Sequence, residues 1–263
     1  MKARAPIVLT AVAILVGLFL ILPGLMVLPM SFNGARSMRF PPDTLSLQWY
    51  ENFFTNAAWT RSLMNSLLVS VLSALVATVV GGLAAFALVR HRFPGKPLVA
   101  GLLLAPLATP VVILGLGDYA LFLDWGLTGT PVGFVFAYLV TALPYVVITV
   151  SASLVSVKPE YELAAAVHGA SQASVFFRIT LPLVMPGVLA GFLFAFVTSF
   201  DETVIAIFLS DPSFRTLPVT MYSSMTREVD PTIASASSVI MLATTGILLV
   251  YVALTRKKKD TTS

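Results

Sequence analysis

The sequence contains no cysteine and few charged residues. Of its 263 residues, 11% are charged, whereas a soluble globular protein has roughly a quarter. A disulfide framework and a thiolate metal site are therefore excluded. With 57% hydrophobic residues and a mean hydropathy of +0.93, the chain has more apolar surface than a water-facing fold can bury. The composition predicts an integral membrane protein.

Sequence motifs for catalysis are also missing. No G-x-x-x-x-G-K-[ST] occurs, so the chain binds no nucleotide through a P-loop, and there is no H-E-x-x-H zinc motif. The only histidines, His91 and His168, fall in predicted cytoplasmic loops. We therefore expect no enzyme and no cofactor, metal or nucleic acid bound to this chain. A transporter, a channel and an assembly scaffold remain.

Apolar runs of about 20 residues mark the predicted membrane spans. There are six of them, within a single domain covering residues 1–263: 7–30, 63–89, 98–123, 131–155, 181–209 and 232–254. The first run is too long for a cleaved signal segment and has no small-residue cleavage site, so we expect it to remain as a span. Pro106, Pro110 and Pro144 are expected to break or kink the helices that contain them.

The distribution of Lys and Arg predicts the orientation. With the N-terminus inside, the inner segments hold eleven of the sixteen basic residues and the outer segments hold five. Cytoplasmic loops carry such an excess. Both termini are therefore predicted to be cytoplasmic, and the basic run Arg256–Lys259 is expected to lie on anionic headgroups.

The cytoplasmic loop 158–182 contains the clearest local helix signals. Pro159 suits the first position of a helix, and two glutamates follow it in the first turn, where the helix dipole favours anions. Ala164–Ala166 favours helix and leaves a thin surface, and Gly169 can end the helix in a left-handed conformation. These residues predict a short capped helix, which could be a plain connector or could dock into a cleft of another protein.

A known family matches this loop. The pattern Glu162-x-Ala164-Ala165, followed by Gly169 and by Ile179-x-Leu181-Pro182, resembles the EAA loop of binding-protein-dependent ABC importer permeases. Four further segments resemble the spermidine/putrescine-type subfamily, so that the likeness covers nearly the whole chain: Phe40-Pro41-Pro42 with Leu47-x-Trp49-Tyr50, Phe200-Asp201-Glu202, Thr216-Leu217-Pro218-Val219 and Asp230-Pro231-Thr232-Ile233-Ala234.

One position departs from the family pattern. The usual glutamate lies six residues before the glycine, where this chain has Leu163, and Glu162 lies seven before it. We therefore expect the backbone shape at Ala164, Ala165 and Gly169 to matter more for docking than the charge of Glu162.

The resemblance implies the fold and the partners. The fold is all-α and integral to the membrane, with six transmembrane helices arranged as in a type I ABC importer (MetI-like) permease of the cell inner membrane. The implied partners are an ABC ATPase dimer on the cytoplasmic face, which holds ATP and Mg, a second homologous permease, an extracytoplasmic substrate-binding protein and membrane lipid. The implied ATPase-coupling residues are Glu162, Ala164, Ala165, Gly169, Ile179, Leu181 and Pro182.

An acidic doublet, Asp201-Glu202, interrupts the fifth apolar run in its outer half. A carboxylate inside the membrane is costly unless it faces water or a partner. A cationic solute would be attracted to it, although a structural contact for the fifth span explains the doublet almost as well. We add Phe200, for a cation–π contact, and Asp118 to the candidate substrate path.

The function expected from these features is a permease subunit of an importer for a small cationic solute, with a polyamine as the first candidate. The same architecture could import an opine, aminobutyrate, a phosphonate or a metal ion. A self-contained secondary transporter would predict inverted repeats, which the sequence lacks, and would leave the loop unexplained. A membrane scaffold would predict that neutralising the acidic doublet changes only stability.

Overall fold

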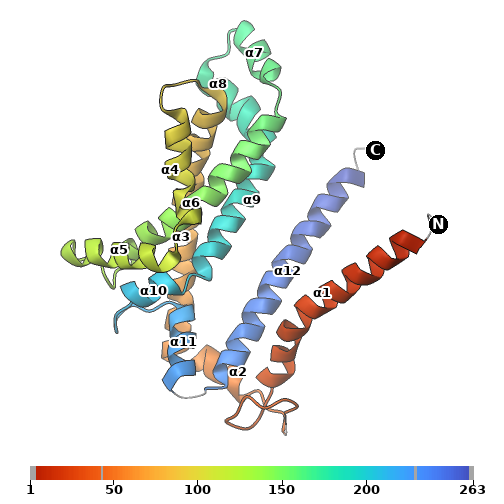
Figure 1. Cartoon of the computed structure of the whole chain (residues 1–263), viewed down its shortest axis with the longest axis vertical. Helices are drawn as coiled ribbons and strands as arrows, with labels where there is room; N and C mark the ends of the chain where they lie inside the picture. The colour runs from red at the N-terminus through yellow and green to blue at the C-terminus, as the bar shows by residue number, and fades with distance from the viewer. Residues whose placement is uncertain (1–3, 43, 228–229, 261–263) are drawn as a thin grey trace. The chain divides into compact units, whose positions relative to one another are not determined.

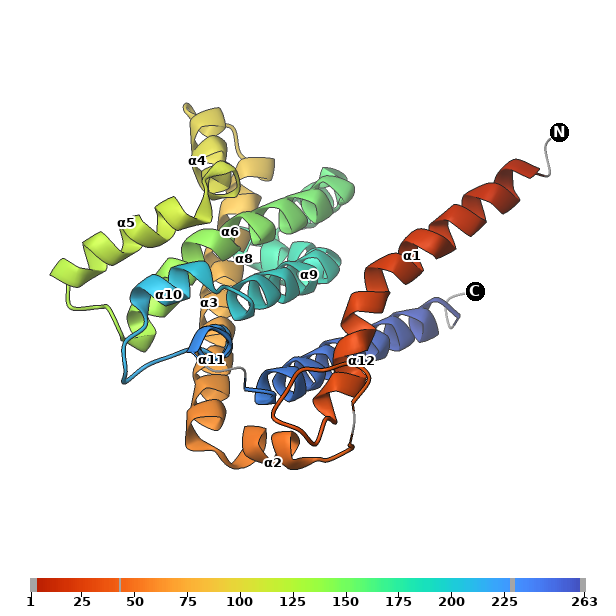
Figure 2. The same ribbon diagram turned by 60° about the horizontal axis from the view of Figure 1, so that its bottom comes forward.

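The computed structural model describes the backbone of residues 4–42, 44–227 and 230–260, and side chains within 9–42, 44–226 and 230–246. In these residues the chain is helical, with one isolated β-bridge between Asn33 and Leu45. The predicted all-α fold is confirmed. The chain divides into two compact units, residues 1–60 with 221–263 and residues 61–220 (Figures 1 and 2).

The first unit joins the two ends of the chain. It is built on α1 (Arg4–Ser31), α2 (Gln48–Thr55) and α12 (Thr232–Asp260). The α12 helix packs on both α1 and α2. The Ser235 hydroxyl donates to the Ser31 carbonyl at 3.2 Å, and the Asn52 amide donates to the Thr232 hydroxyl at 2.8 Å. The side chains of the basic run 256–259 lie outside the described residues, so their contact with headgroups stays a prediction.

The second unit holds the remaining helices, with the ends of α3 and α11 reaching beyond it. In chain order they are α3 (Ala57–Arg90), α4 (Lys96–Ala108), α5 (Val111–Asp124), α6 (Pro131–Ser156), α7 (Pro159–Val167), α8 (Gln172–Val175), the π-helical turn η1 (Phe176–Thr180), α9 (Leu181–Phe200), α10 (Val204–Leu209) and α11 (Leu217–Arg227). Within this unit, α7 and α8 lie at one end, beside the end of α3 and the start of α4 (Figure 1).

The core of this unit is the pair α6 and α9, which pack closely along their lengths. A Cβ atom placed on Gly191 of α9 would lie 2.6 Å from the Thr149 hydroxyl and 3.3 Å from the Val146 Cα atom of α6. Small residues at such contacts let two membrane helices approach, and close packing then holds them together. The loop follows α6 and precedes α9, and the acidic doublet follows α9, so this pair connects the two features.

Of the six predicted spans, the described residues contain four or five of full length. Four described helical segments are long and apolar enough to cross a membrane, and the bent pair α4 and α5 would make a fifth. These four are Leu9–Ser31, Ala57–Arg90, Pro131–Ser156 and Gln172–Phe200. The described part of α12, Thr232–Gly246, is a shorter apolar helix.

The third predicted span, 98–123, is not one straight helix. It bends by 104° between α4 and α5. Thr109 is extended, with φ −90° and ψ 129°, because the ring of Pro110 disfavours a helical residue before it. By contrast, Pro144 stays inside the continuous helix α6, and Pro106 stays inside α4.

The fifth predicted span, 181–209, is also divided. Helix α9 ends at Phe200, and α10 begins at Val204. The three residues between them include the acidic doublet, so the charged residues coincide with the interruption of the helix.

Candidate functional site

The loop helix α7 begins and ends at the predicted residues. Pro159 occupies its first turn together with Glu160 and Glu162. At its C-terminal end Gly169 has φ +83°, the left-handed conformation that glycine adopts without a steric penalty. Gly169 N–H donates to the Ala166 carbonyl at 3.0 Å, and Ala170 N–H donates to the Ala165 carbonyl at 3.1 Å. This pair of bonds is a Schellman motif, which ends the helix sharply.

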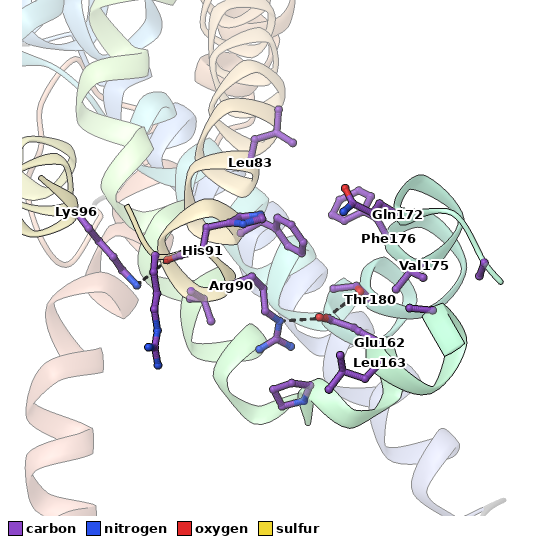
Figure 3. A pocket seen from close by; sticks show the side chains of 16 residues that line it. Leu83, Arg90, His91, Lys96, Glu162, Leu163, Gln172, Val175, Phe176 and Thr180 are labelled. Atoms are coloured by element: carbon purple, nitrogen blue, oxygen red, sulfur yellow. Dashed lines mark hydrogen bonds and ion pairs between the residues drawn. The ribbon is translucent and has the colours of Figure 1, made fainter. Parts of the chain in front are cut away.

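Glu162 fastens α7 to two membrane-spanning helices. Its Oε1 atom accepts from Arg90 Nε at 3.1 Å and from the Thr180 hydroxyl at 2.9 Å (Figure 3). Arg90 is the last residue of α3, and Thr180 is the last residue of η1, just before α9. The Arg90 side chain also donates to the Val157 carbonyl at 2.9 Å. It therefore contacts the chain both before and after Lys158, the N-cap residue of α7.

The Glu162 contact is largely shielded from solvent. The side chains of Arg90 and Glu162 are 12% and 18% exposed, and Thr180 is 1% exposed. Charge-assisted hydrogen bonds in such a site are stronger than those between neutral groups. The charge of Glu162 therefore has a structural role that the departure from the family spacing did not indicate.

The opposite face of α7 is exposed and is not covered by any described residue of the chain. Tyr161 and Val167 are 54% and 84% exposed, and Ala164 is exposed between them. The face is thin at Ala164 and apolar at its sides. It can enter a cleft of another protein without burying a charge of its own.

The other predicted coupling residues lie where the loop enters the membrane-spanning helix. Ile179 is half-buried in η1, and Leu181 and Pro182 begin α9. A π-helical turn is uncommon and often marks a functional position in a helix. Here it places the Thr180 hydroxyl on Glu162.

The acidic doublet lies between α9 and α10, and its two members have different environments. The Glu202 carboxylate accepts from Ile205 N–H at 3.0 Å and so caps the N-terminal end of α10. The Glu202 carbonyl accepts from the Tyr138 hydroxyl of α6 at 3.2 Å. Asp201 ends α9 and its side chain is exposed. Of the two residues, Asp201 is the more exposed.

The two remaining path candidates are placed separately. Phe200 is half-buried, and its ring centroid lies 5.8 Å from that of Phe196. Asp118 is on α5, which packs against α10, and its buried Oδ2 atom has no hydrogen-bond partner in the described part of the chain. No hydrogen bond or ion pair between described residues joins Asp118 to the doublet.

The sequence thus identified the helix and its ends, but not the residues that bind it to α3 and η1. Arg90 entered the sequence argument only as one of the inner basic residues, and Thr180 did not enter it at all. A basic residue at the end of the second apolar run was the available signal for Arg90. The Tyr138 contact with Glu202 had no sequence signal, because tyrosines in membrane spans are common.

Comparison with known proteins gives the family. A family model described as binding-protein-dependent transport system inner membrane component matches residues 77–260. The spermidine/putrescine transport system permease protein PotC of Escherichia coli strain K12 is 30% identical, over 91% of this chain and 90% of its own. The putrescine transport system permease protein PotI of the same strain is 34% identical, over 88% of this chain and 84% of the PotI chain.

A solved structure gives the same fold. One chain of the bacterial alginate ABC transporter, in complex with an alginate pentasaccharide-bound periplasmic protein, has a TM-score of 0.70. It is 18% identical, and the match covers 94% of this chain and 91% of that one. Together with the predicted spans and the loop motif, these matches establish that the chain belongs to the family of binding-protein-dependent transport system inner membrane components, the permeases of ABC importers.

Proposed function

We propose that this permease carries a small polyamine, of the spermidine or putrescine type, into the cytoplasm. The observation that carries the proposal is its identity of 30% and 34% to two permeases named for these solutes, over 88% or more of this chain. The exposed Asp201 at the α9–α10 break supports it, because a polyamine is a cation and a carboxylate attracts it directly.

The energy for transport would come from a separate subunit. This chain has no P-loop, so ATP and Mg are expected in an ATPase dimer that the exposed face of α7 contacts from the cytoplasmic side. The hydrogen bonds from Arg90 of α3 and from Thr180 of η1 to Glu162 would pass movement of α7 directly to the spans. A second homologous permease and an external binding protein would complete the importer.

Reconstitution tests the subunit assignment. This chain alone in proteoliposomes is expected to move no labelled spermidine or putrescine, with or without ATP, because it lacks an ATPase. Co-reconstitution with its ATPase, partner permease and binding protein should give ATP-dependent uptake. Uptake by the chain alone would show a self-contained transporter instead.

Substitution of the doublet tests the path. Asp201→Asn removes an exposed charge without changing shape, and we expect the KM for a polyamine to rise about tenfold while the complex assembles normally. Glu202→Gln, the matched change at the neighbouring position, should instead lower thermal stability, because it removes the negative charge that caps the N-terminal end of α10. Unchanged polyamine kinetics in Asp201→Asn importers would remove Asp201 from the path.

Binding by the external receptor separates the possible solutes. The receptor that works with this permease is expected to bind spermidine or putrescine more tightly than an opine, aminobutyrate, a phosphonate or a metal ion. A preference for one of those solutes would replace the proposed cargo while leaving the importer assignment unchanged.

A further inference from the structure

A pocket lies between α7 and the adjoining ends of α3 and α4. It has a volume of about 870 Å³ and is open to its surroundings. Figure 3 shows side chains from α3, α7, α8 and η1 around it. Its lining includes the basic residues Arg90, Arg92 and Lys96 and the apolar residues Leu83, Phe86 and Phe176.

The pocket carries a net positive charge. Three of its lining residues are Arg or Lys, and its only acidic residue is Glu162. That carboxylate is already occupied by Arg90 and Thr180. Arg92 forms no hydrogen bond or ion pair with another described residue, and Lys96 donates only to the His91 carbonyl, at 3.2 Å. Two cationic groups therefore lack an anion.

An apolar groove adjoins the pocket. It has a volume of about 400 Å³ and shares Leu83, Phe86 and Phe176 with the basic pocket. The groove runs along α3 from Phe86 back to Thr78, and a helix rises about 12 Å over that distance. Its other wall comes from α6, η1 and α9, through residues such as Val150, Leu181 and Val184.

An aromatic pair marks the passage between the two spaces. The Phe86 and Phe176 rings meet edge to face, with centroids 5.3 Å apart. The basic side also coincides with the end of the long apolar helix α3 and the start of α4. Basic residues at the ends of spans lie at the depth of lipid headgroups, where they interact with anionic lipid.

We propose that the pocket binds the headgroup of an anionic phospholipid of the cytoplasmic leaflet, with an acyl chain in the adjoining groove. The phosphate pairs with Arg92 and Lys96, and the chain packs on Phe86 and Phe176. The occupant must have an anionic end and an apolar tail that enters between membrane-spanning helices. A soluble ATPase could supply the first but not the second, which favours a lipid.

This lipid would be a structural partner of the coupling site. Arg90, which lines the pocket beside Glu162, donates to that carboxylate and to the Val157 carbonyl, so both of its partners belong to the protein. An anion on Arg92 and Lys96 would balance the remaining charge beside it. The inference is independent of the identity of the transported solute.

Lipid retention tests the proposal. The full chain is purified with its co-expressed partner subunits and exchanged into nanodiscs with equal amounts of phosphatidylglycerol and phosphatidylcholine, and bound lipid is then measured by native mass spectrometry. The wild-type complex should retain phosphatidylglycerol in preference. Each basic group near an anionic headgroup contributes on the order of a fivefold preference for anionic lipid. The ratio of bound phosphatidylglycerol to bound phosphatidylcholine should therefore fall at least about fivefold in the Arg92→Gln/Lys96→Gln complex.

Two further variants separate charge from the groove. Lys158→Gln/Arg178→Gln removes two basic residues near the same loop that do not line the pocket, and it should retain phosphatidylglycerol as the wild type does. Gly82→Leu adds a side chain to the groove wall, where a Cβ atom would meet nothing within 4 Å. It should lose bound lipid although every charge remains.

Five results would overturn the proposal. The first four are equal retention of both lipids by the wild type, equal loss in the control and the pocket variant, full retention in Gly82→Leu, and displacement of the lipid by inorganic phosphate at matched ionic strength. The fourth would assign the pocket to a free anion. Loss of the ATPase subunit from the Arg92→Gln/Lys96→Gln complex, with its lipid retained, would assign these residues to a protein contact.

Discussion

Importers with Gly169→Val are expected to assemble normally and to lose about nine-tenths or more of their substrate uptake. Gly169 has φ +83°, a conformation that costs an ordinary L-residue about 1–2 kcal/mol and a β-branched residue more. Each 1.4 kcal/mol changes an equilibrium about tenfold. The Schellman end of α7 would therefore open, and the helix would present the wrong surface to the ATPase.

The structure separates this effect from a steric clash within the chain. A Cβ atom on Gly169 would meet nothing within 4 Å, so the cost is in the backbone. Gly169→Asn is expected to keep most of the uptake, because asparagine tolerates the left-handed region. Gly126, with φ +65° and equally open surroundings, provides the matched control. Gly126→Val imposes the same kind of strain away from α7.

The measurement is ATP-driven uptake together with substrate-stimulated ATP hydrolysis in reconstituted complexes. Loss of uptake with continued hydrolysis in Gly169→Val, and normal coupling in Gly126→Val, is the expected pattern. Equal losses in both variants would mean that backbone strain acts through general instability. Full coupling in Gly169→Val would show that the end of α7 has no part in docking.

Features set by neighbouring residues could be read from the sequence. Pro159 and Gly169 act on the backbone within a few residues of themselves, and both ends of α7 lie where they indicate. The apolar runs indicated the spans for the same reason, since a helix in lipid must satisfy its backbone polar groups by hydrogen bonds within itself. Pro110 predicted a disturbance of the third span, although its size of 104° depends on how α5 packs against α10.

Contacts between distant segments could not be read in this way. Arg90 lies 72 residues before Glu162, and Thr180 lies 18 residues after it. These side chains come from α3, α7 and η1, and α3 shares a core cluster with α6 and α9, so their meeting depends on tertiary packing. The different roles of Asp201 and Glu202 likewise depend on the end of α9, because a cap exists only where a helix begins or stops.

Substitutions that break the ion pair of Arg90 and Glu162 are expected to lower both stability and coupling. Arg90→Gln leaves the Glu162 carboxylate with only the Thr180 hydroxyl, and Glu162→Gln leaves the Arg90 guanidinium with the Val157 carbonyl as its remaining partner. Each change leaves one charge largely shielded and unpaired. Removing one member of a buried pair costs about 3 kcal/mol or more, and we expect a lower Tm and about tenfold weaker coupling of hydrolysis to uptake.

The double variant Arg90→Gln/Glu162→Gln decides whether pairing is the cause. It contains neither charge, and two amides can still hydrogen-bond across the same gap, so it should be more stable and better coupled than either single variant. Glu160→Gln, an exposed glutamate in the same turn, controls for the loss of a negative charge at the start of α7 and should behave as the wild type does. If the losses in the two single variants simply add in the double variant, the residues act independently. The link from α7 to α3 and α9 would then have to run through the backbone alone.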